Sequence, residues 1–265
     1  MKYHVLSILI LFSLKLSTRA SLSIESSERE EGQARILYGE IPKIYEQPYL
    51  VDLVVVFNNG KIKNCAGALV SEKYVLTAAH CIKNSKDIWS VNVIYGTLNL
   101  KDTDKPYQTT NQTIVHPLYE VSNDGFARND IALVKLLKPV RLSRQVGLIK
   151  LPDKSQVKKR FKGAKAVVAG WGLTENATNS FVLKKAIVTV PEDDLLCRGP
   201  KYLICAFGKK DQTPCSGDSG SPLVWRKKFI IGILSSGNCL SESYYTRVTM
   251  YLDWIAKNSD VRIKQ

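Results

Sequence analysis

The stretch Cys215-Ser216-Gly217-Asp218-Ser219-Gly220-Ser221-Pro222-Leu223 places a serine between glycines, in a segment able to form a tight turn. A serine hydroxyl is a weak nucleophile until a base takes its proton, and the oxyanion that forms on a carbonyl substrate needs preorganised amide donors. Gly217 has no side chain to obstruct that oxyanion. The stretch therefore predicts acyl transfer through Ser219, with a general base and a carboxylate supplied from elsewhere in the chain.

The base should be a histidine, and the chain has three histidines, His4, His80 and His116. His116 precedes Pro117 in a polar stretch, and we expect it at the surface. His80 lies in Leu76-Thr77-Ala78-Ala79-His80-Cys81, where small residues leave room around an imidazole. A histidine merely packed beside a disulfide would explain this segment taken alone. Together with the serine motif, the segment predicts His80 as the general base.

The third group should be a carboxylate held away from water that accepts the other imidazole proton. Asp130 begins the apolar segment Ile131-Ala132-Leu133-Val134-Lys135-Leu136, and we expect its side chain to be half-buried. An acid at the start of a strand can equally be a turn cap. Three other aspartates lie in polar loops, where we expect them to be solvated: Asp102, Asp104 and Asp124.

Residues 1–20 have the layout of a secretory signal. Lys2 precedes an apolar run at 5–14, and small and polar residues lead to Ala20, where we place the cleavage. A membrane anchor is the alternative, but the run is short and Lys15 follows it, whereas spanning a bilayer takes about 20 apolar residues. We therefore expect a secreted, extracellular product without membrane contact, from which His4 is lost with the signal.

The rest of the chain has two parts with different patterns. Residues 21–35 are polar and acid-rich, and we expect them to form a removable leader. From Ile36 onward, short β-branched and aromatic runs alternate with turn residues, which favours an all-β protein with a helix only near 248–255. Pro139 and its basic neighbours at 138–144 resemble a connector, which divides 36–265 at about residue 140. The expected strands are Leu50–Phe57, followed by the hairpin residues Asn58-Asn59-Gly60, and 91–95, 131–137, 164–170, 186–190, 229–235 and 244–248.

Cysteines and sequons agree with export. All six cysteines follow the signal, and an even number in an exported chain predicts a disulfide framework. Two sequons, which begin at Asn111 and Asn176, predict glycosylation on the same route.

The formal net charge is +14, with basic runs at Lys158-Lys159-Arg160-Phe161-Lys162 and Arg226-Lys227-Lys228. Such an excess can attract sulfated polysaccharides or other polyanions. The alternative is a set of solvated lysines on strand ends and loops. No signature of a nucleic-acid module accompanies the charge and no acidic loop indicates a calcium site, so we expect no nucleic-acid partner, no metal and no cofactor.

These segments resemble the trypsin and chymotrypsin family, in which the triad follows the chain order histidine, aspartate, serine. The resemblance extends from Ile36 to the C-terminal helix and includes Ala169-Gly170-Trp171-Gly172 and Gly232-Ile233-Leu234-Ser235. It implies two six-stranded antiparallel β-barrels with the catalytic groups in the cleft between them. It also implies an endopeptidase whose partners are protein or peptide substrates and protein inhibitors. The amides of Gly217 and Ser219 would form its oxyanion hole.

The resemblance further implies an activation site and a disulfide pattern. A trypsin-like activating protease would cleave after Arg35, and the new ammonium of Ile36 would pair with Asp218. Tyr38 and Ser236 stand where the family usually has glycine and tryptophan, and Tyr38 leaves a weakly active or inactive binding homologue as the alternative. The implied pairs are Cys65 with Cys81, Cys197 with Cys205 across a loop shorter than usual, and Cys215 with Cys239.

By the same resemblance, Thr213 forms the floor of the primary pocket, where trypsin-like enzymes carry aspartate. Gly237 leaves the wall open, and the small Ser243 lies at the back, so the neutral slot predicts a chymotrypsin-like preference for large apolar residues. A shift of one residue in the alignment would instead place Glu242 in the pocket and restore basic specificity. Ser235 is a further substrate-binding residue of this wall.

Overall fold

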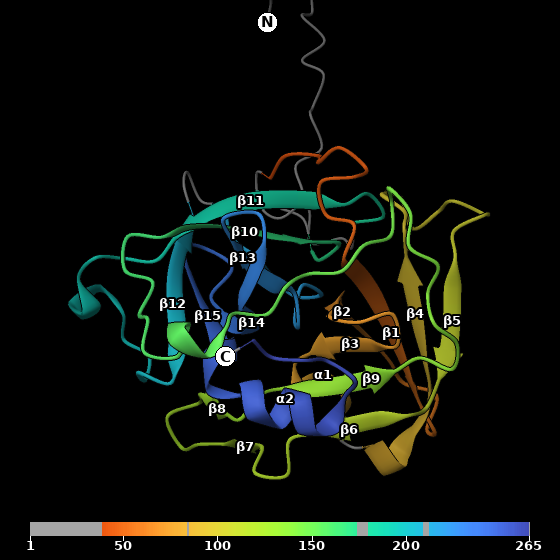
Figure 1. Ribbon diagram of the computed structural model, residues 1–265, viewed down its shortest axis with the longest axis horizontal. Coiled ribbons are helices and arrows are strands. Elements are labelled where there is room, and N and C mark those ends of the chain that lie inside the picture. Colours follow the sequence, from red (N-terminus) through yellow and green to blue (C-terminus); the bar gives the residue numbers. More distant parts are fainter. Residues whose placement is uncertain (1–38, 84, 174–179, 209–211, 265) are drawn as a thin grey trace, which may run out of the picture. The chain divides into compact units, whose positions relative to one another are not determined.

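The computed structural model describes residues 39–83, 85–173, 180–208 and 212–264 (Figure 1). The expected signal, the leader and the activation site lie outside these ranges, as does Asn176. Strands dominate the described residues, and the longest helix among them is α2 (Leu252–Asn258), near the C-terminus as expected. None of these helices is long and apolar enough to cross a bilayer.

The N-terminal half forms an antiparallel sheet in the order β5-β4-β1-β2-β3-β9-β6. Its edge strands β5 and β6 follow one another in the chain, with Asn111 and Gln112 between them. At this bend Thr110 Oγ1 donates to the Lys135 carbonyl at 2.9 Å, and the Lys135 N–H donates to the Gln112 carbonyl at 2.8 Å. The sheet is therefore a seven-stranded half-barrel whose two edges belong to one bent segment, where the resemblance implied a six-stranded barrel. Its strands are β1 (Leu50–Phe57), β2 (Ile62–Leu69), β3 (Tyr74–Thr77), β4 (Ile88–Tyr95), β5 (Tyr107–Thr110), β6 (Thr113–Val115) and β9 (Ala132–Lys135).

The C-terminal half forms a closed six-stranded barrel in the order β10-β11-β12-β15-β14-β13, which confirms the expected barrel. Closure pairs both edges of every strand, so this barrel has no free edge. Its strands are β10 (Lys165–Gly170), β11 (Lys184–Thr189), β12 (Leu203–Gly208), β13 (Pro222–Trp225), β14 (Phe229–Gly237) and β15 (Glu242–Arg247). The remaining elements are the hairpin of β7 (Glu120–Val121) and β8 (Ala127–Arg128), the short helix α1 (Ala79–Ile82), and the 3-10 turns η1 (Ser85–Asp87), η2 (Lys154–Gln156), η3 (Asp194–Leu196) and η4 (Val248–Met250).

Strand β1 illustrates how apolar residues build the N-terminal core. Leu53 and Val55 are completely buried, and β1 pairs with β2 on one side and β4 on the other. The turn into β2 contains Gly60 at φ +79°, and its N–H donates to the Phe57 carbonyl at 2.9 Å. Glycine adopts this left-handed backbone without strain, so the expected hairpin is confirmed.

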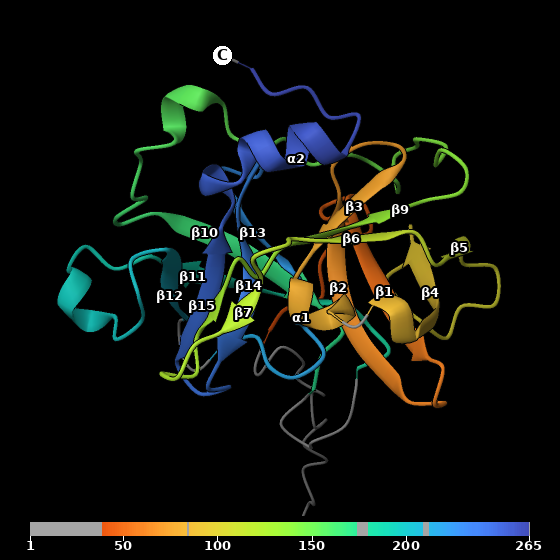
Figure 2. The same cartoon turned by 90° about the horizontal axis from the view of Figure 1, so that it is seen from below.

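The C-terminal helix joins the core of the N-terminal sheet (Figure 2). Tyr251 and Ile255 are buried in the same cluster as Leu133 of β9. His116 packs against this helix, with ring centroids 5.4 Å from Tyr251 and 5.2 Å from Trp254. The expectation that His116 is a plain surface residue was therefore wrong: the imidazole is half-buried, and burial lowers its pKa.

Candidate active site

Two neighbouring strands bring His80 and Asp130 together. Thr77, at the end of β3, pairs with Ala132, at the start of β9. His80 lies just beyond Thr77 on α1, and Asp130 lies just before Ala132. Because the two strands are antiparallel, both side chains lie at the same end of the sheet.

The Asp130 carboxylate is completely buried, where we expected it to be half-buried. Its Oδ2 lies 2.8 Å from His80 Nδ1, and its Oδ1 accepts the His80 backbone N–H at 2.8 Å. Ser235 Oγ donates to the same Oδ2 at 2.5 Å. These three donors satisfy the hydrogen-bonding capacity of the buried carboxylate. Two of them belong to His80 and hold its ring and its backbone in place.

Residues from distant parts of the chain hold the backbone around Asp130. Asn129 adopts φ +52°, a left-handed conformation that asparagine tolerates better than most residues. Its Nδ2 donates to the Leu118 carbonyl at 2.7 Å, and its Oδ1 accepts from the Tyr251 hydroxyl at 3.1 Å. Thr246 Oγ1 of β15 donates to the Asp130 carbonyl at 2.9 Å. The C-terminal half thus fixes an aspartate that the N-terminal half supplies.

The other ring nitrogen of His80 lies near the sulfur of the neighbouring Cys81. His80 Nε2 lies 3.8 Å from the Cys81 sulfur, which lies 3.7 Å from the Ser219 carbonyl oxygen. The Ala66 N–H donates to that carbonyl at 2.7 Å. The polar contacts of the imidazole among the described residues do not include Ser219 Oγ. Catalytic hydrogen bonds of this kind commonly tighten only when substrate binds.

Two glycines shape the serine loop. Gly217 adopts φ +94° and Gly220 adopts φ +87°, conformations that residues with a side chain rarely occupy. A Cβ at Gly220 would also lie 2.2 Å from the Ala66 carbonyl oxygen. The Gly220 N–H donates to the Leu234 carbonyl at 2.9 Å, so the loop is docked on β14 directly beside Ser235. The loop predicted to carry the nucleophile Ser219 is therefore hydrogen-bonded to the strand whose Ser235 binds Asp130.

Asp218 is completely buried beneath this loop. Its Oδ1 accepts the Gly172 N–H at 2.8 Å, and its Oδ2 accepts the Cys215 N–H at 3.0 Å. Burial raises the pKa of this carboxyl to about 6, although both amide donors act in the opposite direction. A Cβ would lie 2.1 Å from Oδ1 if built at Gly170 and 2.6 Å from Oδ2 if built at Gly172. Glycines at both positions make room for the carboxylate.

Residues 36–255 match the family described as Trypsin. The chain belongs to the trypsin family of serine proteases. It is 33% identical over 241 residues to granzyme M of Rattus norvegicus, covering 85% of this chain and 89% of that protein. It is 34% identical over 208 residues to chymotrypsin of Phaedon cochleariae, covering 75% of this chain and 73% of that one. A solved structure of HL collagenase superposes with a TM-score of 0.76 at 28% identity, covering 86% of this chain and 100% of that one.

The protease has the three disulfides that the family resemblance implied. They join Cys65 to Cys81, Cys197 to Cys205 and Cys215 to Cys239. Cys65, His80 and Cys81 lie close enough to resemble a metal site, but the two sulfurs are bonded to each other and are not thiolates. The first disulfide instead ties the helix that carries His80 to β2.

The residues assigned to the primary pocket lie on two connected segments of the protease. Gly237 of β14 pairs with Ser243 of β15. Thr213 is completely buried two residues before Cys215, whose disulfide partner Cys239 follows Gly237 closely. Ser243 is also completely buried, and its Oγ donates to the Ala206 carbonyl at 3.1 Å.

Glu242 lies on the opposite face of β15. Its carboxylate accepts the hydroxyl of Tyr244 and lies 4.0 Å from the Cys205 sulfur. Ser243 Oγ contacts the Tyr245 hydroxyl at 3.1 Å on the other face, in keeping with the alternation of side chains along a strand.

Two features of the site were missed in the sequence. Ser235 was expected only as a substrate-binding residue, whereas its hydroxyl binds the Asp130 carboxylate. Gly172 was noted only as part of a resemblance, whereas its N–H binds Asp218. Both residues stood in the quoted family segments, but their partners are distant in the chain, so spacing could not reveal the contacts.

Proposed function

We propose that this protease is a secreted endopeptidase that hydrolyses peptide bonds through an acyl-enzyme on Ser219. The observation that carries the proposal is the buried Asp130 carboxylate 2.8 Å from His80 Nδ1. With Nδ1 protonated and held by Asp130, Nε2 is the nitrogen left to act as the base. The trypsin-family match over residues 36–255 supports the same chemistry.

In the proposed reaction, His80 Nε2 takes the Ser219 proton while Oγ attacks the substrate carbonyl carbon. The N–H groups of Gly217 and Ser219 stabilise the oxyanion that forms. The C–N bond then breaks, and His80 gives its proton to the leaving amine. A water molecule next loses a proton to His80 and attacks the ester, and Ser219 regains its proton as the acid product leaves.

Covalent labelling with a fluorophosphonate tests this role of Ser219, because only a base-assisted hydroxyl attacks such a probe at a useful rate. The activated protein should label, and Ser219→Ala should not. Wild-type labelling no stronger than that of the variant would favour the alternative, a catalytically silent homologue with a binding or regulatory role.

We infer that the chain is made as a zymogen with a signal at 1–20 and a leader at 21–35. Cleavage after Arg35 would free the ammonium of Ile36 to pair with Asp218. The support is that Asp218 is buried with two backbone donors and no cation within ion-pair distance among the described residues. A cation would offset the cost of burying this charge and would lower the pKa of the carboxyl.

Two variants test activation. Arg35→Gln should remain inert after treatment with trypsin, and Asp218→Asn should be cut at Arg35 but remain poorly active. Full activity of either variant would mean that the protease is activated by another route.

We infer that the primary pocket prefers large apolar side chains. Thr213 and Ser243 are neutral, and the carboxylate of Glu242 lies on the strand face opposite Ser243, which weighs against the shifted alignment. Peptide substrates that end in Phe or Arg before the scissile bond should be compared in competition. A preference for Arg that is lost in Glu242→Gln would overturn this assignment.

The same proposal includes glycosylation and partners. Asn111 is exposed at the bend between β5 and β6, where a glycan would not disturb the core, and Asn176 carries the second sequon. Expected partners are protein substrates, an activating trypsin-like protease and protein inhibitors. Enzymatic deglycosylation of the secreted product should lower its mass, and Asn111→Gln should remove part of that shift.

A further inference from the structure

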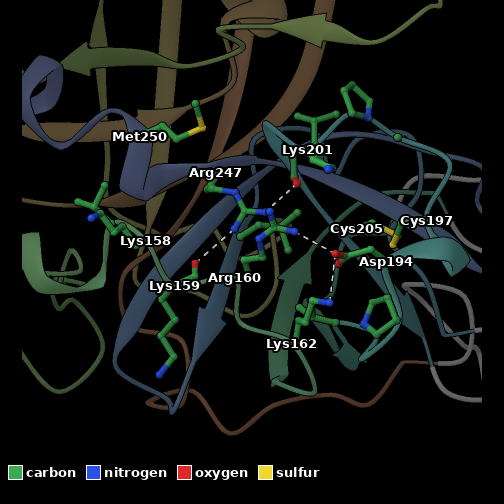
Figure 3. A pocket seen from close by; sticks show the side chains of 17 residues that line it. Lys158, Lys159, Arg160, Lys162, Asp194, Cys197, Lys201, Cys205, Arg247 and Met250 are labelled. Atoms are coloured by element: carbon green, nitrogen blue, oxygen red, sulfur yellow. Dashed lines mark hydrogen bonds and ion pairs between the residues drawn. A yellow bond between two sulfur atoms is a disulfide. The ribbon is translucent and has the colours of Figure 1, made fainter.

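A pocket of about 330 Å³ lies on the C-terminal barrel, between the segment at 157–162 and the loop closed by the Cys197–Cys205 disulfide (Figure 3). Among the described residues, its lining contains a single acid, Asp194. Figure 3 shows Arg160 and Arg247 side by side at its centre. Six cations line it: Lys158, Lys159, Arg160, Lys162, Lys201 and Arg247.

Arg247 places a positive charge in the recess of the pocket. Its guanidinium is half-buried and donates to the Leu203 carbonyl at 3.0 Å and the Lys159 carbonyl at 3.5 Å. Among the described residues it forms no ion pair. Burial lowers its pKa, and the nearby Arg160 acts in the same direction, whereas Asp194 acts in the opposite direction. A bound anion would relieve both costs.

Asp194 neutralises only part of this charge. Its Oδ2 lies 2.9 Å from Arg160 Nη1 and 3.1 Å from Lys162 Nζ. These pairs are solvent-exposed and therefore weak. One carboxylate facing six cations leaves the pocket strongly positive.

The positive surface continues beyond the pocket. Lys159 Nζ lies 4.3 Å from the centroid of the Trp225 ring, and the Arg226 guanidinium lies 4.2 Å from the same centroid. Lys228 Nζ lies 5.3 Å from the centroid of Phe229. The two basic runs of the sequence are thus neighbours in space, joined through Trp225.

We propose that this surface binds a sulfated polysaccharide, with a sulfate in the pocket near Arg247 and the chain passing over Lys159 toward Arg226. An extended row of cations fits a linear polyanion better than an isolated small anion. Single-stranded nucleic acid would need open aromatic faces, but Trp225 is 8% exposed and is covered by Lys159 and Arg226. A flat anionic bilayer would not reach a charge in a recess.

The test measures binding of a heparin octasaccharide to the full-length chain carrying Ser219→Ala, so that it does not depend on peptidase activity. The triple variant Lys158→Gln/Arg160→Gln/Lys201→Gln should bind about a hundredfold more weakly at about 0.15 M salt, and the salt slope should fall by about three. A matched control, Lys73→Gln/Lys135→Gln/Lys138→Gln, loses the same charge from exposed positions of the N-terminal half and should bind like the parent.

Asp194→Asn provides a change in the opposite direction. It removes the carboxylate that competes for Arg160 and Lys162, so heparin affinity should rise about fivefold. Equal losses in the two triple variants, or no gain in Asp194→Asn, would overturn the proposal. The proposal would also be overturned if the protein bound any of three other probes as tightly as it binds the octasaccharide. These probes are desulfated heparin, a DNA oligonucleotide of equal charge and phosphatidylserine vesicles. Thermal unfolding of each variant checks that it is folded.

Discussion

Replacing Gly172 by alanine tests whether the position of Asp218 determines the geometry of the serine loop. The added Cβ would lie 2.6 Å from the Cγ and Oδ2 atoms of Asp218 and 2.7 Å from its Oδ1. The carboxylate would have to move by about 0.8 Å or more to restore van der Waals contact. It is completely buried and is also held by the Cys215 N–H at 3.0 Å, so it cannot swing into solvent.

The displacement should therefore pass to the backbone on either side of Asp218, which carries the amides of Gly217 and Ser219. Loss of one oxyanion donor lowers kcat by about 100- to 1000-fold. We expect Gly172→Ala to lower kcat by about 100-fold with KM changed less than about threefold, because the donors act on the transition state. The strain should also lower the free energy of unfolding by about 1 to 3 kcal/mol.

The assay is steady-state hydrolysis of a peptide anilide by the activated protease, with thermal unfolding of the same samples. Gly60→Ala is the matched control: Gly60 has φ +79°, and no atom of the described residues lies within 4 Å of an added Cβ, so the variant is destabilised by backbone strain far from Asp218. Wild-type kcat in Gly172→Ala, or an equal loss of kcat in Gly60→Ala, would refute the reasoning.

Three further predictions concern the triad, a buried acid and a disulfide. Asp130→Asn should lower kcat by about four orders of magnitude, because the amide no longer holds His80 in the required tautomer. This is the established size of the effect in a serine–histidine–aspartate triad. Hydrolysis of the peptide anilide measures the loss of kcat. Burial raises the pKa of Asp52 from 3.8 to about 7, so the contribution of this group to the free energy of unfolding should be fully present below the lower value and should be lost as the pH rises through both. Unfolding in urea should show that Asp52→Asn removes about 4 kcal/mol of this dependence, whereas identical pH profiles would contradict the assignment. Opening the disulfide that spans 8 residues, by replacing both Cys197 and Cys205 with serine, should lower the free energy of unfolding by about 2 to 3 kcal/mol and leave kcat unchanged.

Local pattern predicted much of the fold. The apolar run at Leu50–Phe57 and the turn at Gly60 could be recognised locally, because a run of β-branched and apolar residues and a left-handed glycine act within a few residues. The strand expected at 131–137 is shorter, Ala132–Lys135, since its ends depend on which partners remain available for pairing. The bend between β5 and β6 has no such signal, although it joins the two edge strands of the first sheet.

Burial of polar groups was harder to infer. Asp52 lies in the middle of β1, where the sequence offers a charged residue in an apolar run, yet it is only 5% exposed. His116 was expected at the surface because its neighbours in the chain are polar. Its actual neighbours are Tyr251 and Trp254, which only folding brings close.

The sequence by itself determined the chemical groups of this protease. Residue type and order were enough to recognise three features, because each reflects a local chemical requirement. These are a serine between glycines, a histidine among small residues and an aspartate before an apolar strand. The tertiary structure decided which groups meet: Ser235 with Asp130, Gly172 with Asp218, and the two basic runs around Trp225. Hydrogen bonds and charges act over a few ångströms, and the partners in these contacts are separated in the chain by tens of residues, so only packing of the strands could bring them within reach.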